Sequence, residues 1–287
     1  MTVPQTDGAL EVIRKRAKER NTSKLLEISY SDIDSLEAET SLGINGRHQY
    51  TNAALAVALC KEWIACRQKD GVEFEMAPDF VKSGLKTAFW PGRCQKIQSD
   101  RYPGFVWFVD GAHTAESMKA CADWFESELK VNISSPSLDD IPPVYLIFNC
   151  THGRDAYRLL PDLVRIFKML PNSKAVFCTN TMVSPTRDEP DAPSTSDSAT
   201  SDLQNNMVMP DPELNAQRHS AKVWCELAVE PNAEHRADIA ASIMDAVEII
   251  KKDATNKSGQ HDVKNILVTG SLHLVGAVLE FIKNPIS

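Results

Sequence analysis

From about residue 90 onward, short and almost purely apolar runs alternate with longer amphipathic stretches. The runs predict strands, at residues 105–110, 144–149, 174–178, 222–228 and 265–270. The stretches between them predict helices, at residues 115–130, 155–170 (interrupted near Pro161), 233–252 and 273–283. A strand that is apolar at every position needs cover on both faces. We therefore expect an α/β fold with a Rossmann-like open, mostly parallel sheet and helices on both faces.

The first 88 residues have a different pattern. Their amphipathic and apolar stretches predict helices at 8–20, 51–67 and 79–88, and the short run 25–29 predicts a strand. Thr51 is available to cap the start of the second helix. This part of the chain therefore reads as a separate, mainly helical segment.

Residues 184–206 are rich in Ser, Thr, Pro and Asp and contain almost no large apolar side chain. Such a segment cannot bury enough surface to offset the entropy lost on ordering. We expect a disordered insertion in a surface loop.

The overall charge excludes some classes of partner. The 287 residues contain 31 Lys and Arg against 39 Asp and Glu, which gives a net charge of −8. An acidic chain is a poor candidate for non-specific binding to nucleic acid or anionic membranes, so we expect neither partner.

Seven cysteines without a Cys-x-x-Cys pair indicate no zinc knuckle and no disulfide framework. With an N-terminus unlike a secretory signal, this pattern favours the cytoplasm.

Three predicted strands end in residues suited to a ligand. They are Asp110-Gly111-Ala112-His113, Asn149 with Thr151-His152-Gly153-Arg154, and Thr269-Gly270-Ser271-Leu272-His273. Ligands of open α/β sheets bind beyond the carboxyl ends of strands, and free N–H groups at helix starts favour phosphate or carboxylate. Gly, Ser, Thr and Asp are also common helix caps, so a purely structural role remains the alternative for each turn.

Two further residues are candidates on their chemistry. Arg93 follows Trp90-Pro91-Gly92, and a guanidinium on such a turn suits phosphate, the alternative being a solvated surface arginine. Asn52 precedes the apolar part of the second helix, where its amide could recognise an adenine edge or bond locally.

No Gly-Lys dipeptide and no Gly-x-Gly-x-x-Gly occurs, so the common phosphate loop and the dinucleotide fingerprint are both missing. A nicotinamide-dependent oxidoreductase would rest on the sheet type alone.

Taken in order, four motifs resemble the folylpolyglutamate synthase family of Mur ligases, its eukaryotic members in particular. The motifs are Gly46-Arg47-His48-Gln49 with Asn52-Ala53, Trp90-Pro91-Gly92-Arg93-Cys94-Gln95, Val109-Asp110-Gly111-Ala112-His113-Thr114, and Val268-Thr269-Gly270-Ser271-Leu272-His273-Leu274-Val275-Gly276. The resemblance covers nearly the whole chain but only the C-terminal half of the family's enzyme. It implies that residues 1–88 are the end of the central ATPase domain and residues 89–287 the C-terminal Rossmann-like domain. The family's phosphate loop and magnesium ligands have no counterpart, so the resemblance implies no metal ligand in this chain.

The resemblance also implies roles for single residues. Asn52, Arg93 and Asp110 would bind ATP, through adenine, phosphates and ribose respectively. His113 would be catalytic, at the boundary between ATP and the incoming glutamate. Ser271 and His273 would hold the glutamate carboxylates.

The implied activity is an ATP-dependent ligation that adds L-glutamate to the γ-carboxyl of tetrahydrofolates through an acyl phosphate. Its cofactors would be ATP and Mg²⁺, and its substrates L-glutamate and tetrahydrofolate polyglutamates. The alternative is a non-catalytic fragment or paralogue that keeps only nucleotide and glutamate contacts. The sister dihydrofolate synthase reaction cannot be separated from the first reading. We expect a monomer, cytoplasmic unless a lost upstream segment carried a mitochondrial transit peptide.

Overall fold

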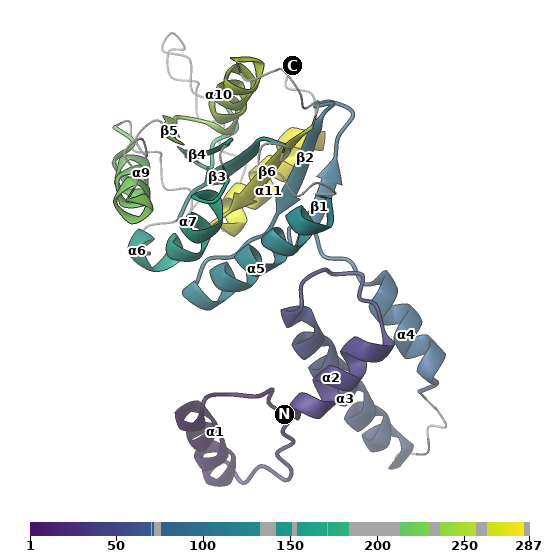
Figure 1. Ribbon diagram of the computed structural model, residues 1–287. Coiled ribbons are helices and arrows are strands. Elements are labelled where there is room, and N and C mark those ends of the chain that lie inside the picture. The colour runs from purple at the N-terminus through teal and green to yellow at the C-terminus, as the bar shows by residue number, and fades with distance from the viewer. Residues whose placement is uncertain are drawn as a thin grey trace, which may run out of the picture. The chain divides into compact units, whose positions relative to one another are not determined.

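The computed structural model describes residues 1–69, 71, 76–132, 142–150, 154–170, 172–183, 213–229, 236–256 and 263–283. The chain forms two compact units, Met1–Pro91 and Gly92–Ser287. Each unit is coherent by itself, and Figure 1 labels its helices and strands. The expected insertion at 184–206 lies outside the described residues.

The N-terminal unit contains four helices, α1 (Asp7–Glu19), α2 (Tyr30–Glu39), α3 (His48–Lys69) and α4 (Pro78–Thr87). Three of them were expected, and α2 was not. Ser29 begins α2 with a capping box, in which its hydroxyl accepts from the Asp32 N–H and its own N–H donates to the Asp32 carboxylate. The strand expected at 25–29 reduces to one parallel bridge between Thr2 and Glu27. Because α3 starts at His48, Thr51 lies inside the helix and does not cap it.

The C-terminal unit is built on a six-stranded sheet in the order β1-β2-β6-β3-β4-β5. The strands are β1 (Gln95–Gln98), β2 (Phe105–Val109), β3 (Val144–Phe148), β4 (Ser173–Cys178), β5 (Ala237–Ala240) and β6 (Lys264–Thr269). Strand β1 pairs antiparallel with β2, and all other neighbours are parallel. The expected α/β class with a mostly parallel sheet is confirmed.

Helices cover both faces of this sheet (Figure 1). They are α5 (Ala115–Asn132), α6 (Ala156–Leu159), α7 (Pro161–Phe167), α9 (Asn215–Ala228), α10 (Ile243–Asn256) and α11 (Leu272–Lys283). Alternate strand residues belong to two separate cores. Val106 and Phe108 of β2 pack with α5, α7 and α9, whereas Trp107 and Val109 pack with α10 and α11. This double burial is why the strands are apolar at every position.

Two elements expected in the C-terminal unit were wrong. The run 222–228 is the end of helix α9, whose buried residues Gln217, Ser220, Ala221 and Trp224 have helical spacing that the short window concealed. The helix expected at 233–252 instead holds strand β5 and the first part of α10. The interruption near Pro161 is confirmed, because α6 ends before this proline and α7 begins with it.

Candidate functional site

The three polar strand ends meet at one edge of the sheet. Three backbone hydrogen bonds join them: Asp110 N donates to Val268 O at 3.1 Å, Gly270 N to Ala112 O at 3.1 Å, and Asn149 N to Thr269 O at 3.4 Å. The ends become neighbours because β6 lies between β2 and β3. This edge is where a parallel sheet positions ligand-binding residues.

Asp110 is buried at this edge, with only 6% of its surface exposed. Its Oδ2 accepts from the backbone N–H of Cys94 at 2.8 Å, and its Oδ1 accepts from that of Ala112 at 2.9 Å. The thiol of Cys94 also contacts Oδ2, at 3.4 Å. Burial, together with the nearby Asp110 charge, raises the pKa of this thiol. The carboxylate therefore connects two segments of the chain.

Arg93 lies on a sharp turn beside Asp110. Gly92 and Cys94, on either side of it, have φ angles of +73° and +41°. The turn is tied by Gly92 N donating to Gln95 Oε1 at 2.8 Å and by Gly111 N donating to Gly92 O at 3.0 Å. Within the described part of the chain the half-buried Arg93 side chain makes no hydrogen bond or ion pair. Its guanidinium is therefore available to an anion.

Two glycines lie where these segments approach each other. A Cβ on Gly111 would lie 2.2 Å from Leu272 Cδ2 and 2.5 Å from Arg93 Nη1. Gly270 has a φ of +103°, and a Cβ there would lie 2.4 Å from the backbone oxygen of Asn149. Both glycines therefore allow close contact between strand ends.

His113 follows at the start of α5 and is half-buried. Its Nδ1 donates to the carbonyl oxygen of Gly111 at 3.0 Å. In a neutral imidazole this hydrogen bond leaves Nε2 as the acceptor. The backbone N–H groups of His113 and Thr114 donate to Ser117 Oγ, so the first turn of α5 is partly capped by its own residues.

The two residues expected to hold glutamate differ in exposure. Ser271 is 1% exposed, and its hydroxyl accepts from the backbone N–H of His273 at 3.2 Å at the start of α11. Its observed role is thus a cap. His273 is exposed on the first turn of α11.

The remaining candidates are on helix α3 and in the segment after strand β3. Asn52 belongs to the N-terminal unit, where it is exposed on α3 and donates to Gln49 Oε1 at 2.9 Å. Thr151, His152 and Gly153 lie outside the described residues, and Arg154 is exposed.

Sequence reasoning singled out Asn149 but missed the amide cluster that it forms with Asn180 and Gln217 at the same edge. Asn149 donates to Asn180 Oδ1 at 2.8 Å and accepts from Gln217 Nε2 at 2.9 Å. This cluster links the ends of β3 and β4 to helix α9. Gln217 could have been noticed as a polar residue on the apolar side of a helix, but only if α9 had been recognised.

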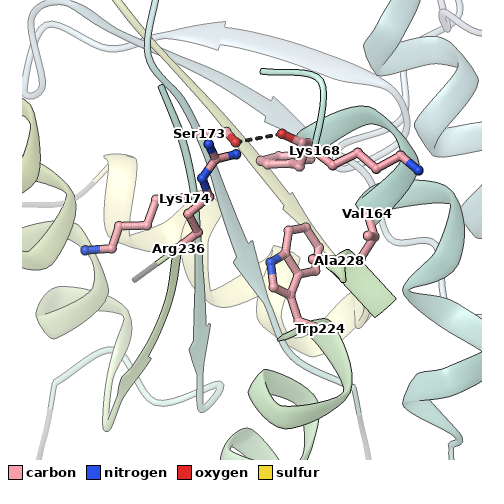
Figure 2. A pocket seen from close by; sticks show the side chains of 8 residues that line it. Val164, Lys168, Ser173, Lys174, Trp224, Ala228 and Arg236 are labelled. Carbon is pink, nitrogen blue, oxygen red and sulfur yellow. Dashed lines mark hydrogen bonds between the residues drawn. The ribbon is translucent and has the colours of Figure 1, made fainter. Parts of the chain in front are cut away.

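A shallow pocket lies at the opposite edge, where β4 begins (Figure 2). It is lined by Val164, Phe167, Lys168, Ser173, Lys174, Trp224, Ala228 and Arg236. Ser173 Oγ donates to Phe167 O at 2.8 Å, and Lys174 pairs with Asp238 at 2.6 Å. The pocket contains none of the candidate residues.

Metal-binding clusters and membrane-spanning helices are both absent from the described residues. No group of three or more His, Cys, Asp or Glu side chains in these ranges could hold a metal ion. No helix among them is long and apolar enough to cross a membrane.

Known proteins similar to this chain point to one family, although no protein-family model matches it. It is 31% identical to the folylpolyglutamate synthase of Arabidopsis thaliana over 318 residues, which covers 98% of this chain and 53% of the relative. It is 30% identical to the enzyme of Candida albicans over 295 residues, covering 96% of this chain and 51% of the relative. The fold matches that of Mycobacterium tuberculosis folylpolyglutamate synthase with a TM-score of 0.54 at 18% identity, covering 86% of this chain and 42% of that one.

The alignments cover almost all of this chain, and the motifs at its strand ends anticipated the same family. The chain spans about half the length of the curated relatives it matches. The chain is therefore homologous to the folylpolyglutamate synthases over about half of their length.

Proposed function

We propose that this chain supplies the nucleotide- and glutamate-contacting half of an ATP-dependent ligase that adds L-glutamate to the γ-carboxyl of tetrahydrofolates. The observation that carries the proposal is the convergence of Arg93, Asp110 and His113 at one edge of the sheet in a homologue of folylpolyglutamate synthases. The related Mycobacterium tuberculosis enzyme is described as complexed with ADP and AMPPCP, which supports a nucleotide as the ligand here.

The residues at this edge fit a nucleotide phosphate. Arg93 offers planar N–H donors that no described side chain occupies, and the lack of a Cβ on Gly111 lets its guanidinium lie close to the backbone. ATP would bring the phosphoryl group that activates the folate carboxylate. Arg93 would orient and neutralise that phosphate, and charge neutralisation of this kind supplies most of the catalysis in phosphoryl transfer.

His113 is proposed to act at the boundary between nucleotide and glutamate. Because its Nδ1 is committed to the Gly111 carbonyl, the ring is held with Nε2 able to accept a proton. The incoming amine of glutamate must lose a proton as the amide forms, and Nε2 is the acceptor we propose. His273, exposed on the adjacent turn, remains the candidate for a glutamate carboxylate.

We further propose that residues 1–88 end the ATPase domain and that residues 89–287 form the C-terminal domain of such a synthase. The phosphate loop and the Mg²⁺ ligands would then come from the rest of the synthase, because the chain contains no Gly-Lys dipeptide. The lack of a phosphate loop favours a second candidate function for the isolated chain, which is a folded nucleotide-binding unit without turnover. A monomeric state and a cytoplasmic location remain predictions, to be tested by sedimentation and by cell fractionation.

The experiment that tests the proposal is calorimetric titration of the full chain with ADP. Arg93→Ala is expected to weaken ADP binding by roughly ten- to a hundredfold, the value of a charge-assisted hydrogen bond. Arg165→Ala is the matched control, because Arg165 forms surface ion pairs with Glu126 and Asp123 away from this edge. Equal ADP affinity in Arg93→Ala and the wild-type chain would contradict the proposal.

A further inference from the structure

The carboxylate of Asp110 is held by the chain's own backbone. Its Oδ2 accepts from Cys94 N at 2.8 Å and its Oδ1 from Ala112 N at 2.9 Å, so the two oxygens serve two different segments. Only 6% of the residue is exposed. A buried carboxylate is stable when it accepts N–H donors in this way, and the Cys94 thiol is a further partner of its Oδ2.

The segment to which Asp110 is hydrogen-bonded has a backbone conformation that its own residues disfavour. Cys94 has a φ of +41°, in the left-handed region that L-residues other than glycine rarely adopt. Such a conformation persists only where its surroundings hold it. The hydrogen bond from Cys94 N to Asp110 is one such restraint, and the bond from Gly111 N to Gly92 O is a second.

Arg93 lies between these two restrained residues. Its Nη1 lies 2.5 Å from the position that a Cβ on Gly111 would occupy, so the guanidinium lies against the bare backbone just after Asp110. In the described ranges no side chain fixes the guanidinium by a hydrogen bond or ion pair. The direction of the Arg93 side chain is therefore set by the backbone of the turn.

We propose that Asp110 is a positioning residue for Arg93. By accepting hydrogen bonds from the N–H groups of Cys94 and Ala112, it fixes the turn that orients the guanidinium toward a nucleotide phosphate. This inference rests on the proposed function and deepens it. It differs from the ribose contact implied by the family resemblance, because Asp110 acts here on the phosphate end of the nucleotide through another residue.

Comparing ADP with adenosine tests the inference, since adenosine lacks the phosphates. Asp110→Asn replaces one acceptor oxygen by an NH₂ group that cannot accept from a backbone N–H. We expect ADP affinity to fall roughly tenfold and adenosine affinity to stay unchanged. The double variant Arg93→Ala with Asp110→Asn should bind ADP no more weakly than Arg93→Ala alone, because the two residues act as one unit. Equal losses for both ligands, or additive losses in the double variant, would overturn the inference.

The matched control is Asp155→Asn, which makes the same change of carboxylate to amide at the start of α6, where a single oxygen of Asp155 accepts from the N–H of Tyr157. ADP affinity in this variant should equal that of the wild-type chain. A fall as large as in Asp110→Asn would mean that any exchange of a carboxylate for an amide lowers ADP affinity, and the inference would be wrong.

A nucleotide-free measurement separates this inference from the proposed function. Heteronuclear NMR relaxation of the Arg93 Nε–H group reports whether the side chain is ordered. We expect an ordered group in the wild-type chain and in Asp155→Asn, and a mobile one in Asp110→Asn. If the wild-type chain binds no ADP, the proposed function fails while this readout still decides the positioning role. An Arg93 signal equally ordered in Asp110→Asn, or mobile in the wild-type chain, would refute it.

Discussion

At the scale of single residues, two glycines at the strand ends differ in what surrounds them. A Cβ on Gly111 would meet the ends of two flexible side chains, those of Leu272 and Arg93, which can move aside. A Cβ on Gly270 would meet the backbone oxygen of Asn149 and the ring of Phe148, which cannot. We therefore expect a side chain at Gly111 to displace Arg93, and a side chain at Gly270 to destabilise the fold.

This contrast predicts the effect of Gly270→Ala. The substitution combines a steric conflict with a φ of +103°, and we expect it to lower the free energy of unfolding by about 2–4 kcal/mol. Urea unfolding followed by circular dichroism measures this loss. Gly276→Ala is the matched control, since nothing lies within 4 Å of its Cβ position in helix α11, and alanine there should be neutral or stabilise by up to about 1 kcal/mol. A Gly270→Ala chain as stable as the wild type would contradict the account.

At the scale of elements, ion pairs join helices α5 and α7. Arg165 of α7 contacts Glu126 of α5 at 3.0 Å and Asp123 at 3.4 Å, and Lys130 contacts Glu126 from the next turn of α5 at 2.7 Å. Hydrogen bonds from Lys130 and then from Arg165 hold the pKa of Glu126 below its usual range. Glu126 therefore stays ionised at a lower pH in the folded chain than in the unfolded one.

The pH dependence of this pair follows from that direction. The stabilisation is fully present above the ordinary glutamate pKa, and it is lost as the pH falls through the lower folded value. We expect Glu126→Gln to reduce stability by about 0.5 kcal/mol at pH 6 and by less at pH 3, because the lowered pKa of Glu126 is approached as the pH falls. Urea unfolding at both values tests this, with Glu11→Gln on α1 as an exposed control. A difference that is undiminished at pH 3, or in about 1 M salt, would argue against an ionic origin.

At the scale of the whole molecule, the chain spans about half the length of its relatives and has no Gly-Lys phosphate loop. We predict that the purified chain alone neither hydrolyses ATP with Mg²⁺ nor incorporates labelled glutamate into tetrahydrofolate, because most of the charge stabilisation in phosphoryl transfer would be missing. Assays with Asp110→Ala as the control measure both activities. Incorporation by the wild-type chain that is lost in Asp110→Ala would show that a half-enzyme suffices.

The accuracy of the predictions made from the sequence differed between elements. The fold class and four of the six sheet strands, β2, β3, β4 and β6, were predictable because their apolar runs are long. The run at 222–228 that was predicted as a strand belongs to helix α9. The edge strands β1 and β5 were missed because each has four residues and is only partly buried, which gives too short a pattern. Helix α2 was missed because its apolar face is narrow, with Ile33 as its one buried residue.

The sequence by itself determined the α/β class, the motifs of the strand ends and the family, because burial on two faces and turn chemistry leave local patterns in the chain. Only the tertiary structure decided that β6 lies between β2 and β3, so that Asp110 and Gly270 become neighbours. The tertiary structure also brings the Asp110 carboxylate within hydrogen-bond distance of the Cys94 and Ala112 amides, beside Arg93. Strand order and hydrogen-bond partners depend on contacts between residues far apart in the sequence, and no local pattern encodes them.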